Sequence, residues 1–220
     1  MNSQSLNSLP LEQILQAIAS CSPVPGGGST AALTVALAAA LVAKVAGLGA
    51  RQPDSAEELA PVEKEAHKLA QRAVELADKD AQAYEEVARA QKLAKSTQKD
   101  KATRKRALEI SLLSAAQAPL DTAQCGLQIL ALAEQVVPRC PRAAHSDLAT
   151  AVKLAWTGGA AALFSVDANA LAMGDREALA ELASRRAELE LELEERAAWA
   201  LAPLEENLRG WLGERDSNPH

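Results

Sequence analysis

Aromatic side chains are scarce in this chain of 220 residues, at 2% of the total. Strands favour aromatic and β-branched residues, so this scarcity argues against a large sheet. The hydrophobic share is nevertheless 48%, and it comes mostly from alanine and leucine, which are strong helix formers. A chain of this length can bury one full-sized core. We therefore expect a single helical domain over residues 1–220, with frayed ends at 1–7 and 214–220.

The chain also lacks a net positive charge, since its formal charge is −6 and its pI is about 5.2. Nucleic-acid binding usually needs a basic surface, so we expect no nucleic-acid partner. Cysteine is rare, and no two of Cys21, Cys125 and Cys140 have C-x-x-C spacing. That pattern favours reduced thiols in a cytoplasmic protein. Residues 1–8 hold no basic residue and no apolar run, so no signal peptide is expected.

The sequence also shows no membrane-spanning run, no metal-site spacing and no catalytic triad. The longest charge-free helical run, Ser29–Ala43, is shorter than the roughly 17–25 residues that span a membrane, so we expect no membrane partner. His67 follows Glu63 by one helical turn without a third ligand at metal-site spacing, so no metal is expected. The run His145-Ser146-Asp147 contains triad residue types, but neighbours on a helix do not converge as a triad requires.

Apolar periodicity and capping residues predict six helices and no strand. Their expected spans are about 9–20, 29–49, 55–95, 97–137, 146–173 and 175–212, with Pro119 inside the fourth. The expected capping residues are Ser55 (in a capping box with Glu58), Thr97, Ser146 and Asp175. Two glycines inside the fifth helix, Gly158 and Gly159, indicate close packing of another backbone. Long alanine-rich faces predict an elongated all-α bundle that packs as a homodimer.

The most informative stretch is P-V-P-G-G-G-S-T-A-A-L at residues 23–33. Three consecutive glycines lose much backbone freedom on folding, and here they lead directly into a helix. The free amide groups of a helix N-terminus can face an anion or a polar ligand. The stretch lacks the lysine of a Walker A loop. It looks somewhat like the phosphate loop of GHMP sugar kinases, but that fold needs many strands and none are predicted.

Four further motifs follow the glycine loop: D-A-Q-A-Y-E-E-V at 80–87, L-A-K-S-T at 93–97, A-A-Q-A-P-L at 115–120 and S-D-L at 146–148. In this order the five motifs resemble the cyclodeaminase/methenyltetrahydrofolate cyclohydrolase family, a helical domain found alone in bacteria and fused in formiminotransferase-cyclodeaminase. The resemblance covers roughly residues 9–210. It implies a tetrahydrofolate one-carbon substrate, in a polyglutamylated or unmodified form, and no further cofactor.

The resemblance implies a carboxylate that moves a proton at the one-carbon unit and stabilises its positive charge. Asp80 is the first candidate and Asp147 the second. Each also has a non-catalytic interpretation. Asp80 could be a solvated residue on a helix surface, and Asp147 could interact favourably with the helix dipole. Tyr84 shares a helix face with Asp80. The residues expected to bind substrate are Pro25, Gly26, Gly27, Gly28, Ser29, Tyr84, Ser146, Asn169 and Lys95.

Lys95 begins the chain's one basic cluster, whose other members are Lys99, Lys101, Arg104, Lys105 and Arg106. The cluster is either a solvated helix face or an attractor for a folate polyglutamate tail. We expect the cyclohydrolase reaction, which opens 5,10-methenyltetrahydrofolate to 10-formyltetrahydrofolate. Two alternatives stay open. One is cyclodeamination of formiminotetrahydrofolate, and the other is a non-catalytic folate-binding or structural module, suggested by departures from the family pattern at 142–145 and 165–170.

Overall fold

The computed structural model describes residues 5–216 and, in the last helix, side chains as far as residue 210. The described chain is all-α and contains no strand, which confirms the predicted fold class. The frayed ends expected at 1–4 and 217–220 lie outside the described residues. The elements are η1 (Leu6–Ser8), α1 (Leu11–Ile18), α2 (Gly27–Ala50), α3 (Ala56–Gln91), α4 (Gln98–Val136), η2 (Val137–Arg139), η3 (Arg142–Ala144), α5 (His145–Ala170) and α6 (Arg176–Asp216).

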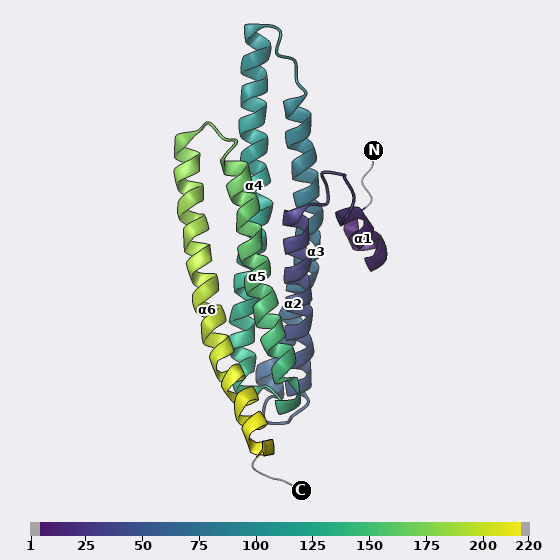
Figure 1. Cartoon of the computed structure of the whole chain (residues 1–220), viewed down its shortest axis with the longest axis vertical. Helices are drawn as coiled ribbons and strands as arrows, with labels where there is room; N and C mark the ends of the chain where they lie inside the picture. The colour runs from purple at the N-terminus through teal and green to yellow at the C-terminus, as the bar shows by residue number, and fades with distance from the viewer. Residues whose placement is uncertain (1–4, 217–220) are drawn as a thin grey trace.

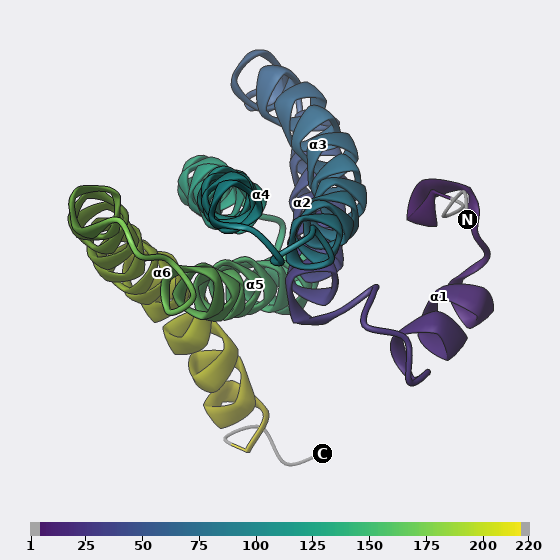
Figure 2. The same ribbon diagram turned by 90° about the horizontal axis from the view of Figure 1, so that it is seen from above.

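The long helices run side by side along one axis, with α3 and α4 extending beyond the others at one end (Figure 1). The most apolar of them, α2, packs against α3, α5 and α4, while α6 covers α5 and α4. Seen from above, α1 stands apart from the bundle (Figure 2), and none of its residues is buried. The core is therefore built mainly from small and branched side chains of α2 to α6, as the composition predicted.

Glycines set the close approach of α5 to its neighbours. A Cβ added at Gly158 would lie 2.8 Å from Val35 Cγ2 of α2, and one at Gly126 of α4 would lie 2.9 Å from the Ala155 carbonyl oxygen of α5. Both distances are too short for a real side chain. The prediction that Gly158 marks a close backbone contact is confirmed, and the contact fixes the register of α2 against α5.

Two of the four expected caps are confirmed. Thr97 and Asp100 form a reciprocal capping box at α4, and Asp175 Oδ1 accepts hydrogen bonds from the amides of Glu177 and Ala178 at α6. The capping box at Ser55 is wrong: with ψ at −6°, its side chain does not reach the first-turn amides and makes no capping bond. The cap at Ser146 is also wrong, because the 3-10 turn η3 continues directly into α5 and the helix begins at His145.

Two helical stretches, 27–49 and 142–170, are long and apolar enough to cross a membrane. From the charge-free run 29–43 alone, no stretch of sufficient length was expected. About half of each is buried inside the bundle, at 56% and 44% of the most apolar window. Core helices of globular proteins pass the same test, so the finding is weak evidence for a membrane span.

The described start of the chain contacts α3. Leu6 is buried at 6% exposure, and its amide donates to Asp78 Oδ1 of α3 at 2.7 Å. At the other end, residues 214–216 continue α6. The expectation of frayed ends at residues 5–7 and 214–216 stays a prediction.

Candidate active site

The glycine loop meets α3 at Asp80. Ser29, in the first turn of α2, is fully buried, and its hydroxyl lies 2.9 Å from Asp80 Oδ2 and 3.0 Å from the Ala77 carbonyl oxygen. One hydroxyl proton serves both acceptors. The carboxylate thus faces the N-terminus of α2, where the helix dipole and the unpaired amide groups favour a negative charge.

Gly28 is the residue that allows this approach. A Cβ added there would lie 2.2 Å from Asp80 Oδ1 and 2.6 Å from its Cγ. No side chain fits at such distances unless the carboxylate moves. By contrast, a Cβ at Gly27 would meet nothing within 4 Å. Of the three glycines, Gly28 is therefore the one that the position of Asp80 requires.

Burial sets the protonation of Asp80. Loss of solvation raises the pKa of its carboxyl above the ordinary value of 3.8, and hydrogen bonds from the side chain and the backbone of Ser29 oppose that rise. Such a carboxylate is a better base than an exposed one, because its charged form is less well solvated. A raised pKa brings the group closer to the range in which a general base works near neutral pH.

A cavity of about 340 Å³ opens in front of Asp80, near the lower end of the range for small-molecule sites. Asp80 is the only charged residue among those that line it. Tyr84 follows one turn later on the same helix and is 46% exposed. The lining residues are Pro23, Val24, Gly26, Gly27, Gly28, Asp80, Tyr84, Val87, Gln91, Leu112, Ala115, Ser165, Ala168, Asn169 and Ala172.

Asn169 enters the same cavity from the C-terminal turn of α5. Its amide nitrogen donates to the carbonyl oxygens of Ala115 on α4, at 3.2 Å, and of Ser165, at 2.9 Å. These two bonds fix the orientation of the amide and leave its oxygen as the acceptor for a ligand. The cavity therefore combines one carboxylate, one aromatic ring and one oriented amide, each from a different position along the sequence.

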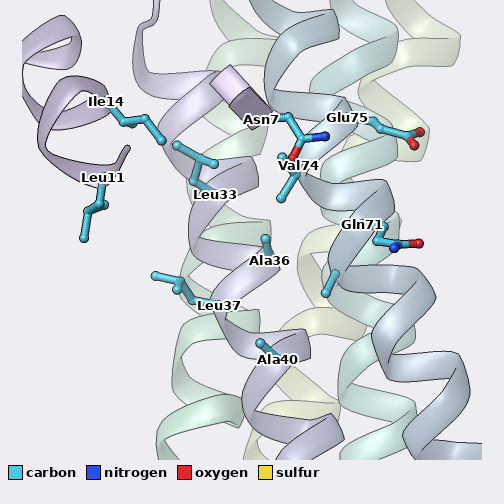
Figure 3. Close-up of a pocket in the computed structure, with 11 residues that line it drawn as sticks. Asn7, Leu11, Ile14, Leu33, Ala36, Leu37, Ala40, Gln71, Val74 and Glu75 are labelled. Carbon is cyan, nitrogen blue, oxygen red and sulfur yellow. The ribbon is translucent and has the colours of Figure 1, made fainter. Parts of the chain in front are cut away.

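A larger groove of about 610 Å³ lies between α1 and the pair α2 and α3. Figure 3 shows its apolar wall, to which Leu11, Leu33 and Leu37 contribute. Glu75 is its one charged lining residue, and the groove holds no convergent set of polar groups. The smaller Asp80 cavity is the better candidate, because catalysis and orientation need converging polar groups more than volume.

The homodimer expected from the sequence stays a prediction.

Comparison with known proteins decides the family. A family model described as formiminotransferase-cyclodeaminase matches residues 10–188. The chain belongs to this family. It is 33% identical over 208 residues to formimidoyltransferase-cyclodeaminase of Sus scrofa, covering 92% of this chain but 38% of that protein. It is 32% identical over 169 residues to methenyltetrahydrofolate cyclohydrolase of Methylorubrum extorquens, covering 76% of this chain and 81% of that protein.

A solved structure has the same fold as this chain. The crystal structure of formiminotetrahydrofolate cyclodeaminase from Thermotoga maritima superposes with a TM-score of 0.81, covering 94% of this chain and 98% of that one, at 22% identity. This likeness establishes the fold alone. The chain spans 38% of the length of its mammalian formiminotransferase-cyclodeaminase relatives.

In this member of the formiminotransferase-cyclodeaminase family, Ser146 and Asp147 lie far from Asp80 within one chain. Asp147 Oδ2 is 2.7 Å from Lys44 Nζ, near the C-terminal end of α2. Lys44 lies sixteen residues after Gly28, which is about 24 Å along the helix. Ser146 lines a separate cavity of about 540 Å³ with Arg142, His145 and Asn207. The structure thus does not bring the two candidate catalytic aspartates together in one chain.

Lys95 also lies outside the Asp80 cavity, in the exposed turn between α3 and α4. Pro25 stays at the loop, where it lines a shallow pocket of about 350 Å³ with Gly26 and Gly27. Of the nine expected substrate-binding residues, the structure places Gly26, Gly27, Gly28, Tyr84 and Asn169 around the Asp80 cavity. Ser29 is adjacent, but its hydroxyl serves Asp80 rather than the cavity.

The sequence arguments missed two polar lining residues, Gln91 and Ser165. Gln91 follows Asp80 by eleven residues, three helical turns, so helical periodicity from Asp80 could have found it. Ser165 precedes Asn169 by one turn and was noted only as a departure from the family pattern. Its carbonyl accepts from Asn169, a backbone role that does not depend on the side chain.

Proposed function

We propose that this protein is a folate one-carbon enzyme that hydrolyses 5,10-methenyltetrahydrofolate to 10-formyltetrahydrofolate. The observation that carries the proposal is the half-buried carboxylate of Asp80, the one charged group among the residues that line its cavity. The methenyl substrate is a cation at its one-carbon unit, and a lone negative charge with little solvent around it attracts such a group strongly. The likeness to methenyltetrahydrofolate cyclohydrolase of Methylorubrum extorquens supports this choice, since this chain covers 81% of that protein.

In the proposed reaction, Asp80 acts as the general base. Its carboxylate removes a proton from a water molecule whose oxygen forms a bond to the methenyl carbon. The tetrahedral intermediate then collapses to a formyl group as one carbon–nitrogen bond breaks. The released nitrogen takes the proton held by Asp80, and the carboxylate takes the proton of the intermediate's hydroxyl group and passes it to solvent. Tyr84 stacks on the pterin, and the oriented amide of Asn169 accepts a hydrogen bond from a ring N–H.

Cyclodeamination is the second candidate, favoured by the identity of 33% to the cyclodeaminase-containing relative. In that reaction the exocyclic N10 amine attacks the formimino carbon and its proton moves to the imino nitrogen. Asp80, in its protonated form, then gives the further proton with which ammonia departs. The same carboxylate serves both reactions because each passes through a carbon flanked by two nitrogens. A raised pKa suits both, since the group must gain and lose a proton in each cycle.

The deciding experiment uses purified protein with each substrate separately. Loss of the methenyl absorbance reports hydrolysis, and ammonia release from formiminotetrahydrofolate reports cyclodeamination. The uncatalysed hydrolysis is measured in parallel without protein. Ammonia release with slow hydrolysis would replace the first reaction by the second. Folate binding without turnover of either substrate would support the non-catalytic alternative instead.

We also propose an orientation for the substrate. The lining of the cavity follows α3 from Asp80 past Tyr84 to Gln91, a distance of about 16 Å at 1.5 Å per residue. There the guanidinium Nε of Arg104 donates to the Gln91 carbonyl oxygen at 3.1 Å. Residues 89–106 hold eight basic residues and one acidic residue in a chain of net charge −6. A folate with its pterin at Asp80 would direct its glutamate tail toward this basic tip.

The orientation is tested by comparing mono- and polyglutamylated substrates. In the double variant Lys99→Gln, Lys101→Gln, we expect the KM for the polyglutamate to rise about fivefold while the KM for the monoglutamate stays within about twofold, because only the tail reaches these charges. Lys153→Gln is the matched control, since Lys153 lies on α5 and pairs with Glu205 at 3.5 Å. Equal changes for both substrates would argue against the orientation.

A further inference from the structure

Asp78 lies two residues before Asp80 on α3, but it faces a different part of the molecule. Its Oδ1 accepts a hydrogen bond from the Leu6 amide at 2.7 Å, and its Oδ2 accepts one from the Ser5 hydroxyl. Leu6 itself is buried in the core. One carboxylate therefore holds the beginning of the described chain against α3.

The segment between this anchor and the glycine loop has few other attachments. No residue of α1 is buried, and α1 stands away from the bundle beside the 610 Å³ groove (Figures 2 and 3). The far end of the segment, at Pro23, Val24 and Gly26, forms one wall of the Asp80 cavity. The position of that wall thus depends on how firmly the segment is held at its two ends.

The two aspartates hold those two ends from one helix. Asp78 binds the start of the segment through Ser5 and Leu6, and Asp80 binds the first turn of α2, which directly follows the segment, through Ser29. Hydrogen bonds to a carboxylate are about twice as strong as those between neutral groups, so both attachments are firm. Because residues 78 and 80 share one helix, the two attachment points keep a fixed distance from each other, and the segment between them is held at both ends.

We propose that Asp78 is a positioning residue, which anchors residues 5–26 so that the loop at 23–26 closes the Asp80 cavity. Asp78 does not touch the cavity, and it acts through the segment that it anchors. The proposal rests on the proposed function only for its effect on turnover. Its effect on the mobility of the segment does not depend on any substrate.

The test compares Asp78→Ala with Glu75→Ala. Glu75 is an exposed carboxylate one turn earlier on α3, and Figure 3 shows it directed away from α1. Both variants remove one negative charge from the same helix, but only the first removes the anchor. Amide hydrogen exchange followed by mass spectrometry reads the mobility of each segment without substrate.

In Asp78→Ala, we expect exchange over residues 5–26 to become at least about tenfold faster, while exchange in α2 to α5 stays unchanged. The KM for the folate should rise about fivefold with kcat within about twofold, because the wall is loosened but Asp80 keeps its place. Asp78→Asn should recover part of both effects, since its amide oxygen still accepts from the Leu6 amide. Glu75→Ala should match the wild type.

Unchanged exchange over residues 5–26 in Asp78→Ala would overturn the proposal, as would equal acceleration through the whole bundle, which would mark a purely structural residue. Faster exchange of the segment with an unchanged KM would also overturn it, because the anchor would then not position the site. If the wild type turns over neither folate, the proposed function fails. The KM is then replaced by the Kd for folinic acid, in which the same rise is expected for Asp78→Ala.

Discussion

Near each end of α2 lies an aspartate from another helix, and the surroundings of the two aspartates differ. At the N-terminal end, Asp80 is bound by a buried serine, faces a cavity and has a raised pKa. At the C-terminal end, Asp147 pairs with Lys44 at the surface, with side-chain exposures of 35% and 57%. Solvent around Asp147 screens its charge, whereas the cavity keeps the charge of Asp80 effective. The cavity in front of Asp80 and its serine partner, more than residue type, separate the two candidates.

Replacing each aspartate by asparagine gives the largest expected difference. Asp80→Asn should lower kcat at least about 100-fold, because an amide cannot accept the proton in the general-base step. Asp147→Asn should lower kcat by less than about tenfold, since within one chain it lies far from the cavity and its charge is screened by Lys44. Steady-state turnover of the methenyl substrate measures both.

An Asp80→Asn variant with wild-type turnover would remove Asp80 from the catalytic role. A loss of kcat in Asp147→Asn as large as that in Asp80→Asn would contradict the view that only the Asp80 end of α2 is catalytic. It would mean that the end of α2 near Asp147 takes part in a site, for example with the cavity of a second copy. Circular dichroism of both variants controls for loss of the helical fold.

The glycine loop gives the next largest effect. In Gly28→Ala the new methyl group would occupy the place of the Asp80 carboxylate, so the carboxylate must move and kcat should fall about tenfold to 100-fold. Gly27→Ala adds the same methyl group where nothing lies within 4 Å, and its kcat should stay within about twofold of the wild type. Equal effects in the two variants would show that the loop acts through its flexibility rather than through this one contact.

The acid limb of the pH profile tests the environment of Asp80. As a general base, Asp80 is active when ionised, so kcat/KM should fall as the pH drops through its raised pKa. Ser29→Ala removes the side-chain hydrogen bond that lowers this pKa and leaves the backbone one in place, so the acid limb should move to higher pH. The limb should be absent in Asp80→Asn. A shift to lower pH in Ser29→Ala would contradict the role given to the serine.

The same raised pKa predicts a cost in stability. The folded state binds the proton of Asp80 more tightly than the unfolded state, so the cost is fully present above the folded pKa and disappears as the pH falls below the ordinary value of 3.8. Asp80→Asn should therefore have a higher Tm than the wild type at neutral pH, with a smaller difference in acid. Thermal unfolding followed at several pH values measures it.

The sequence predicted the helices better than the site. Apolar periodicity needs only local spacing, and it located the six α-helices of the described chain within a few residues of their bounds, but not the three short 3-10 helices. The contact of Gly28 and Ser29 with Asp80 joins residues about fifty positions apart. No local pattern reports such a contact, and Asp80 was chosen through a family motif. The caps at Ser55 and Ser146 failed for a related reason, because turns outside the helices set the backbone at both residues.

The surface pair at the far end of α2 gives the smallest expected effect. Lys44→Met removes the 2.7 Å contact with Asp147, but both side chains are solvated, so the free energy of unfolding should fall by less than about 1 kcal/mol. The loss should shrink further in high salt, because surface charges are screened. Urea unfolding of Lys44→Met, Asp147→Asn and the double variant gives the coupling between the two side chains. A coupling well above this limit would mean that Asp147 is held as firmly as Asp80, and the contrast between the two ends of α2 would then lie in the cavity alone.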